Sequence, residues 1–112
     1  MADCLFCGIV AGDVDAEIVH VTERTVAFRD INAQAPTHVL VVPRIHEPDV
    51  ASLAAAAPEI AAALLVETRR IAQLEGHEAY RLVFNTGAEA GQSVFHAHGH
   101  VLAGRDLGWP PG

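Results

Sequence analysis

Five short segments alternate apolar with polar residues and are rich in β-branched side chains, a pattern typical of strands. They lie at about residues 17–21, 25–29, 38–43, 80–85 and 96–102. Between the third and the fourth, residues 58–76 repeat aliphatic side chains at helical spacing, with Pro58 suited to a first helical position and Gly76 to a C-cap. This order along the chain, with three strands, one long helix and two more strands, predicts an α+β fold. The fold is a five-stranded antiparallel sheet that carries the helix on one face. The alanine-rich residues 51–57 fit either a short helix or a turn.

Composition narrows the possible functions. The 112 residues predict a single domain over residues 1–112. A net charge of -7 argues against binding to nucleic acid, which depends on many Lys and Arg side chains. All seven basic residues are Arg, so a phosphate-binding loop of the G-K-[ST] type is excluded. The longest aliphatic run, residues 39–42, is too short to cross a membrane, and we expect a cytoplasmic protein.

Three histidines, His96, His98 and His100, occupy alternate positions in "FHAHGHVL". In a strand they project from one side, while the small or apolar residues between them face the other. This pattern has three interpretations: a solvated polar face, a zinc site with three histidine ligands, or a nucleophile with neighbours that bind or carry protons.

The segment that precedes the histidines favours a phosphate site. "NTGAEAGQSV" places Gly87 and Gly91 in a turn, with Asn85, Gln92 and Ser93 as neutral hydrogen-bond donors. Glycine lets backbone N–H groups approach an oxyanion closely, although a simple hairpin turn contains glycine as well.

Together these motifs identify the chain as resembling the histidine-triad (HIT) superfamily, in particular its Hint branch of nucleoside phosphoramidate hydrolases. "HAHGHVL" fits the H-x-H-x-H-x-x pattern. "FRDINAQAPTHVLVVPRIH", "YRLVFNTGAEAGQSVFHAHGHVLAGR" and the terminal "WPPG" also resemble Hint segments in order and spacing. One departure is Gly99, where the family usually has a bulkier apolar residue, so the back of this strand is expected to be loose unless a neighbouring side chain fills the space.

The resemblance implies roles for the polar residues. His98 matches the nucleophile, which attacks the α-phosphorus and forms a nucleotidyl-histidine intermediate. His100 and His38 match histidines that contact the phosphate or transfer protons, and Ser93 matches a hydroxyl near the leaving amine. Asn85 and Gln92 match residues that line the phosphate region.

The nucleoside part of the site follows from the same resemblance. Asp30 matches a carboxylate that accepts hydrogen bonds from ribose hydroxyls, although without the family a cap at the end of a strand would be equally plausible. The expected apolar wall for a purine base consists of Leu5, Phe6, Phe28, Ile31 and Leu40. The tail residue Trp109 must find cover on this chain or on a partner, and we include it among the substrate-binding residues.

Cys4 and Cys7 form a C-x-x-C pair, which alone indicates either half of a metal site or a redox pair. Bacterial relatives with this pair bind zinc through it together with histidines that match His46 and His96. The resemblance therefore implies a structural Zn²⁺ held by two cysteines and two histidines, and no cofactor for catalysis.

The function implied is hydrolysis of purine nucleoside 5'-phosphoramidates, such as aminoacyl- or lysyl-AMP adducts, by a homodimer whose sheet continues across the two-fold axis. Three alternatives remain: a dinucleoside polyphosphate hydrolase, a nucleotide-binding dimer without catalysis, and a metal hydrolase with zinc on the three alternating histidines.

Overall fold

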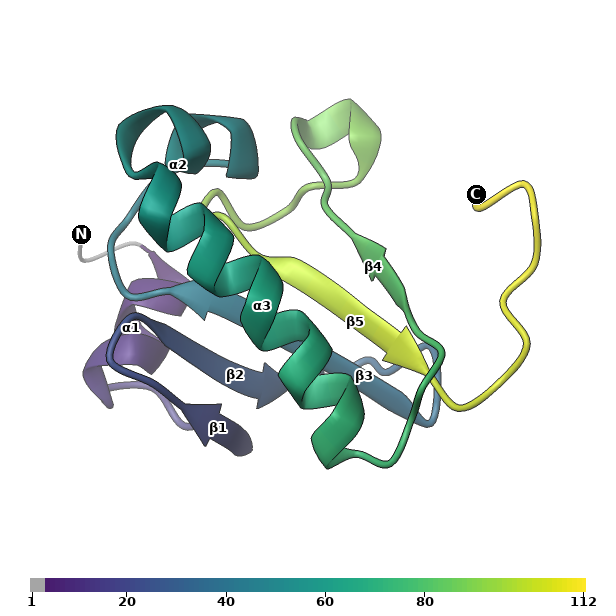
Figure 1. Cartoon of the computed structure of the whole chain (residues 1–112). Helices are drawn as coiled ribbons and strands as arrows, with labels where there is room; N and C mark the ends of the chain where they lie inside the picture. The colour runs from purple at the N-terminus through teal and green to yellow at the C-terminus, as the bar shows by residue number, and fades with distance from the viewer. Residues whose placement is uncertain (1–3) are drawn as a thin grey trace.

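The computed structural model describes residues 4–112 (Figure 1). Its helices and strands follow in this order: α1 (Leu5–Ala11), β1 (Ile18–Val21), β2 (Thr25–Arg29), β3 (Thr37–Pro43), α2 (Val50–Ala56), α3 (Pro58–Leu74), β4 (Arg81–Val83), the 3-10 turn η1 (Ala88–Ala90) and β5 (Gly99–Ala103). None of the helices in this part of the chain is long and apolar enough to cross a membrane.

The strands form one antiparallel sheet in the order β1-β2-β3-β5-β4, which confirms the predicted α+β architecture. β3 lies at the centre and all seven of its residues are buried. β5 pairs with it, so that Leu40 lies opposite His100 and Val39 lies opposite Val101. Partners across an antiparallel pair point to the same face, and this register therefore decides which side chains share the site.

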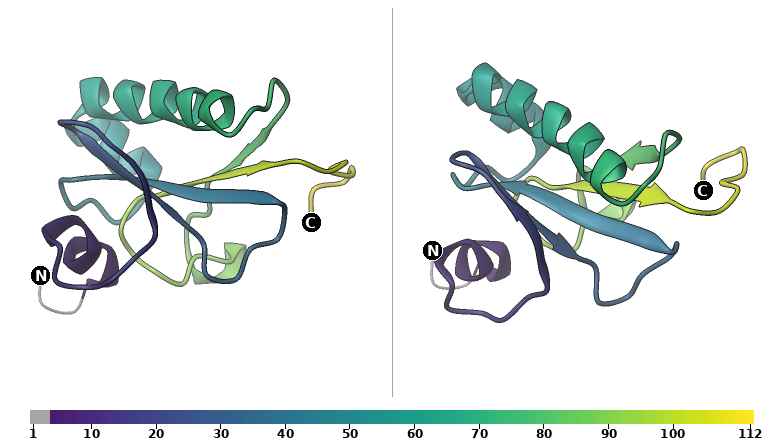
Figure 2. Two further views of the ribbon diagram at one scale, coloured as in Figure 1. Left: turned by 90° about the horizontal axis from the view of Figure 1, so that it is seen from below. Right: turned by 60° about the horizontal axis from the view of Figure 1, so that its bottom comes forward.

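The sheet has a helix layer on each face, and Figure 2 shows α3 and α1 on opposite sides. Alternate side chains of β3 pack against the helices on opposite faces of the sheet. Val39 and Val41 pack with Leu64 and Ile71 beneath α3. Leu40 and Val42 belong to a second cluster with Phe6 and Ile9 of α1, together with Phe28. The long helix is thus where the sequence pattern placed it, and a second, unpredicted helix covers the other face.

The predicted segments differ from the observed ones at their ends. β5 begins at Gly99 and not at His96, because the N–H group of Ala97 donates to the Glu47 carbonyl at 2.7 Å instead of to β3. The alternation of faces nevertheless extends back to His96, since Ala97 packs under α3 with Val101. Residues 51–57 belong almost entirely to α2, which resolves the choice between helix and turn.

The helix α1 has an unusual start. The Cys4 sulfur takes the N-cap role and accepts a hydrogen bond from the Cys7 N–H at 3.2 Å. At the other end Gly12 has the left-handed conformation, φ 82°, that suits glycine at a helix C-terminus. The same cysteines that suggested a metal site therefore begin the helix that carries Leu5 and Phe6.

Gly99 is closely surrounded on its face of the sheet. A Cβ placed there would lie 3.1 Å from Leu82 Cδ1 and 3.1 Å from two ring carbons of Phe84. The strand was expected to be loose only if no neighbouring side chain filled this space, and Leu82 and Phe84 do fill it.

Candidate functional site

Cys4, Cys7, His46 and His96 converge at one end of the sheet, with donor atoms that all lie within 4.8 Å of one another. The Nδ1 atoms of His46 and His96 are 3.2 Å apart, and each cysteine sulfur lies 3.4 Å from a histidine Nδ1. A tetrahedral zinc ion with ordinary Zn–N and Zn–S bonds separates its ligand atoms by roughly 3.3–3.8 Å. The observed spacing therefore fits a zinc ion.

The hydrogen bonds of His96 strengthen this fit. Its ring is fully buried, and Nε2 donates to the Pro43 carbonyl at 2.9 Å. The neutral ring must then present a lone pair at Nδ1, toward the other three donor atoms. Metal-binding histidines are commonly held in this way by an acceptor on their second nitrogen.

His98 lies next along the same face and has a different environment. Its Nδ1–H donates to the carbonyl oxygen of His96 at 2.8 Å, which leaves Nε2 unprotonated. The Phe6 ring meets it edge to face with centroids 5.0 Å apart. Burial lowers the pKa of His98, so the ring is neutral at pH 7 and carries a lone pair suited to nucleophilic attack.

His38 and His100 form a hydrogen-bonded pair, with Nε2 of the former 3.0 Å from Nδ1 of the latter. Nδ1 of His38 accepts from the Gln34 backbone N–H at 3.0 Å, so its Nε2 carries the proton and donates to His100. The second proton of the pair then resides on Nε2 of His100. Burial lowers the pKa of both rings, and that of His100 falls to about 4. The pair thus presents a neutral N–H donor.

Asp30 follows β2 and has two partners of its own. Oδ1 accepts from the Asn32 backbone N–H at 2.8 Å, and Oδ2 lies 3.4 Å from Nε2 of His38. The carboxylate therefore does cap the turn, as its position at a strand end suggested. A carboxylate has about four acceptor positions, which leaves capacity for a ligand.

A cavity of about 430 Å³ joins these groups and lies within the range of small-molecule sites. It brings together nine of the predicted residues: Leu5, Phe6, Phe28, Asp30, Ile31, Leu40, Ser93, His98 and His100. The apolar residues come from α1, β2 and β3, and the polar ones from the ends of β2 and β5 and the loop before β5.

Four predicted residues lie elsewhere, and one of them, His38, does not line the cavity but hydrogen-bonds His100, which does. The Asn85 amide donates to the Ala90 carbonyl at 2.9 Å and closes the η1 turn. The buried Gln92 accepts from the Gly87 N–H and donates to the carbonyls of Pro48 and Val94, so its amide holds the loop in place and does not line the cavity. Trp109 is 84% exposed and finds no cover within the described part of this chain.

Sequence reasoning missed six residues that line the cavity: Ile9, Val14, Asp15, Ala16, Arg29 and Val94. Four of them belong to α1 or the loop after it, and their arrangement depends on a helix that the pattern did not predict. Val94 and Arg29 are sequence neighbours of the predicted Ser93 and Asp30. Their place next to a predicted residue was the only sign in the sequence that they would line the cavity.

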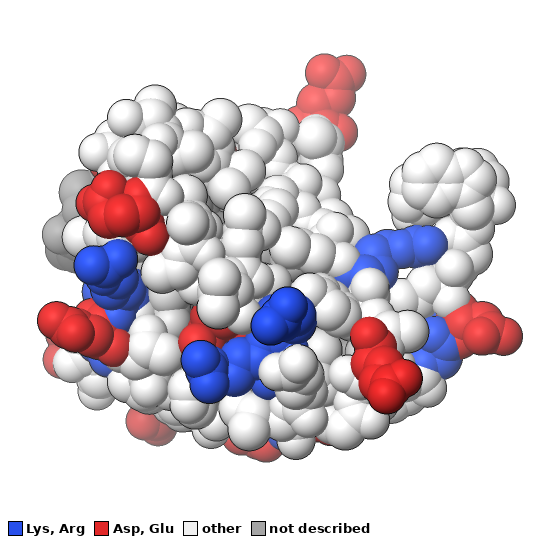
Figure 3. Space-filling view, viewed as in Figure 1, with Lys and Arg blue, Asp and Glu red and all other residues white. Residues whose placement is uncertain are grey.

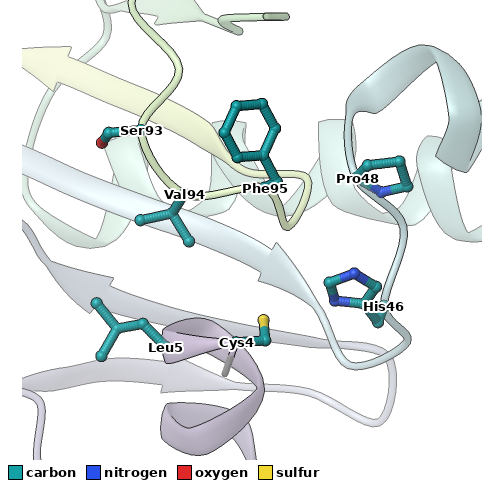
Figure 4. A pocket seen from close by; sticks show the side chains of 7 residues that line it. All are labelled: Cys4, Leu5, His46, Pro48, Ser93, Val94 and Phe95. Carbon is teal, nitrogen blue, oxygen red and sulfur yellow. The ribbon is translucent and has the colours of Figure 1, made fainter. Parts of the chain in front are cut away.

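Figure 4 looks into a second cavity, of about 460 Å³, beside the first. Cys4 and His46 line it, so the metal-type cluster faces open space. Leu5, Ser93 and Val94 line both cavities and form the rim between them. In the figure the Ser93 side chain points away from His46 and Pro48.

The two remaining histidines are half-buried. His20 pairs with Glu67 of α3, and His77 lies 3.0 Å from the Thr37 hydroxyl. Both support the packing of α3 on the sheet and lie outside the cavity.

Comparisons with known proteins show which family the chain is similar to. A family model described as "HIT domain" matches residues 11–107. A HIT family hydrolase from Legionella pneumophila has a solved structure that superposes with a TM-score of 0.93 at 42% identity, covering 98% of this chain and all of that one. A 14 kDa zinc-binding protein of Zea mays is 41% identical over 96% of this chain and 87% of that protein. A purine nucleoside phosphoramidase of Escherichia coli K12 is 37% identical over 95% of this chain and 91% of that protein.

Proposed function

This chain belongs to the HIT family, and from that membership we propose that it hydrolyses purine nucleoside 5'-phosphoramidates through a covalent intermediate on His98. The observation that carries the proposal is the unprotonated Nε2 of His98 at the cavity wall, beside a neutral histidine pair that offers an N–H donor. A nucleophile and a proton donor on one wall are what acyl- or phosphoryl-type transfer through an enzyme-bound intermediate requires.

In the first step, Nε2 of His98 attacks the α-phosphorus and the P–N bond breaks. The amine leaves with a proton supplied through His100 Nε2 or the Ser93 hydroxyl, and the nucleotide remains bound to His98. As charge develops on His98, the carbonyl oxygen of His96 stabilises its Nδ1–H. In the second step, water attacks the phosphorus and gives its proton to the group, His100 Nε2 or the Ser93 hydroxyl, that protonated the amine. The P–N bond to His98 breaks, the His98 ring is neutral again, and the nucleotide is released.

Each part of the substrate is assigned to the cavity wall whose polarity suits it. The apolar wall of Leu5, Phe6 and Phe28 suits a purine base, and Asp30 suits the ribose diol. Asn85 and Gln92 act indirectly in this proposal, because their amides shape the glycine loop beside the phosphate.

The test is turnover of a fluorogenic adenosine 5'-phosphoramidate by wild type, His98→Ala and the matched control His77→Ala, whose ring bonds Thr37 outside the cavity. We expect the first variant to lose at least about 10³-fold in kcat, since the covalent route is lost, and the control to retain activity. Acid quenching should trap nucleotide on the wild-type protein. A His98→Ala enzyme that turns over normally would refute the proposed nucleophile.

We also propose that Cys4, Cys7, His46 and His96 hold a structural Zn²⁺. A closed Cys2His2 set leaves no ligand position for a substrate, so the ion would contribute stability and not take part in catalysis. Activity that vanishes on mild chelation while the fold persists would instead favour the alternative, a metal-dependent hydrolase.

A homodimer is the third part of the proposal. β4 lies at the edge of the sheet and leaves one side open to a second copy. α3 exposes Leu65 and Val66, and Figure 3 shows few charged side chains over the upper part of that face, above α2 and α3. The exposed Trp109 side chain would be buried against the partner subunit in such a dimer. Light scattering at micromolar concentration should give twice the mass of one chain, and a monomer would contradict this part alone.

The alternatives make different predictions in the same assay. A nucleotide-binding module would bind AMP without turnover in either wild type or variants. A dinucleoside polyphosphate hydrolase would cleave such substrates faster than the phosphoramidate.

A further inference from the structure

The loop between α1 and β1 places an acidic residue, Asp15, among those that line the cavity, beside the apolar wall. Val14, Asp15 and Ala16 all line the cavity together with Phe6 and Ile9. The proposed function assigns the histidines, Ser93 and Asp30 to phosphate and ribose. Asp15 and Arg29 are the two charged lining residues that it leaves without a role.

Arg29 is already occupied. Its Nε donates to Glu17 at 2.9 Å, and its two terminal nitrogens donate to Glu75 at 2.7 and 3.1 Å. The guanidinium therefore has its main donors engaged in a structural network. In contrast, none of the ion pairs within residues 4–112 involves Asp15.

The loop that carries Asp15 is firmly held. The N–H groups of Asp13 and Val14 both donate to the Gly8 carbonyl, at 2.9 and 3.2 Å. Val14 also packs directly on α1, since a Cβ on Gly8 would lie only 2.7 Å from its Cγ2. After Asp15, the Glu17 carbonyl accepts from the Arg29 N–H at 3.0 Å. The carboxylate is therefore presented from a loop that is anchored on both sides.

We propose that Asp15 accepts hydrogen bonds from the edge of the purine base and makes the site prefer guanine. This inference rests on the proposed function, because it assumes that the base occupies the apolar wall. A carboxylate accepts two hydrogen bonds side by side, and guanine offers two adjacent donors, N1–H and the 2-amino group. Hypoxanthine offers only N1–H, and adenine presents an acceptor at N1 beside its single amino group. Asp15 is exposed, so we expect a preference of about tenfold and not the much larger discrimination of a fully buried pair.

The experiment compares kcat/KM for guanosine, inosine and adenosine phosphoramidates that share one fluorogenic amine. The variants are Asp15→Asn, Asp15→Ala and the matched control Asp13→Asn, which changes the same charge on the same loop but at a residue that does not line the cavity. We expect a guanosine-to-inosine ratio of about ten in the wild type and in the control. Both Asp15 variants should bring that ratio close to one.

Three outcomes would overturn the inference: equal rates for guanosine and inosine in the wild type, an unchanged ratio in the Asp15 variants, or an equal loss of the ratio in the Asp13 control. If no substrate is turned over, the proposed function fails and the inference is decided by calorimetric binding of GMP and IMP to the same four proteins. A tenfold difference in Kd that depends on Asp15 supports it there, and equal Kd values refute it.

Discussion

Gly99 offers a direct test of how tightly the strand with the histidines is packed. It lies between His98 and His100, and its missing side chain is replaced by Leu82 and the Phe84 ring. The perturbation is Gly99→Val, which places a β-branched side chain at this position. Its Cβ would meet three carbon atoms at 3.1 Å, closer than ordinary van der Waals contact, and its methyl groups would add further overlap.

Two opposing contributions set the magnitude. Replacing glycine in a strand gains about 0.5–1 kcal/mol by restricting the unfolded chain. Overpacking of this kind costs about 1–3 kcal/mol, and valine lies near the upper end because Leu82 and Phe84 are themselves packed against the core beneath α3. We therefore expect a net loss of about 2 kcal/mol, or roughly 8 °C in Tm for a domain of this size.

The assay is urea unfolding at one fixed protein concentration, with Gly99→Val, Phe84→Ala and the double variant. Removing the ring should give the valine its space, so the double variant should be about as stable as Phe84→Ala alone, with a coupling energy of about 2 kcal/mol. Gly108→Val is the control, because a Cβ there meets nothing within 4 Å. A Gly99→Val protein as stable as the wild type, or additive losses in the double variant, would refute the packing argument.

Three further predictions concern pH, metal and a buried charge. Burial lowers the pKa of His100 to about 4, below that of an unfolded histidine, so the unfolded state binds more protons than the folded state between about pH 6.5 and 4. Unfolding free energies should therefore fall as pH drops through this window, and kcat/KM should decline at its acid end as His98 and His100 take up protons. In a thermal-shift assay, removal of zinc by a chelator should lower Tm by roughly 10 °C relative to protein that has free zinc at about 100 times its Kd. The Cys7→Ser variant should show no such difference. Among the ion pairs of residues 4–112, His20→Ala leaves the buried Glu67 carboxylate with Arg70 alone, at 3.4 Å, and should cost about 1–3 kcal/mol in urea unfolding. A loss below about 0.5 kcal/mol would mean that water replaces the ring.

The sheet and the long helix could be predicted because burial imposes a period on the sequence. β2 matches its predicted range of 25–29, and α3 begins at Pro58 as predicted. The ends were less predictable, because they depend on contacts with distant segments. β5 starts three residues after the predicted position because a carbonyl from the loop after β3 takes the hydrogen bond of Ala97.

The helix α1 shows what periodicity cannot reveal. It has seven residues, too few to be stable alone, and a glycine lies within it. Its first turn is capped by a cysteine sulfur, and its stability comes from burying Phe6 and Ile9 on the far face of the sheet. Because this helix was missed, so was the loop that brings Val14 and Asp15 to the cavity.

The metal-type cluster and the proposed nucleophile, His98, are connected through His96. The His96 ring points its Nδ1 at the cysteines, while its carbonyl oxygen accepts the Nδ1–H of His98. Fixing the His96 ring therefore also fixes the carbonyl group that orients the ring of His98. Same-face spacing alone predicted three equivalent imidazoles, because it says nothing of which neighbours each ring meets. Their different environments arise from α1, which supplies cysteines to the first ring and the Phe6 side chain to the second.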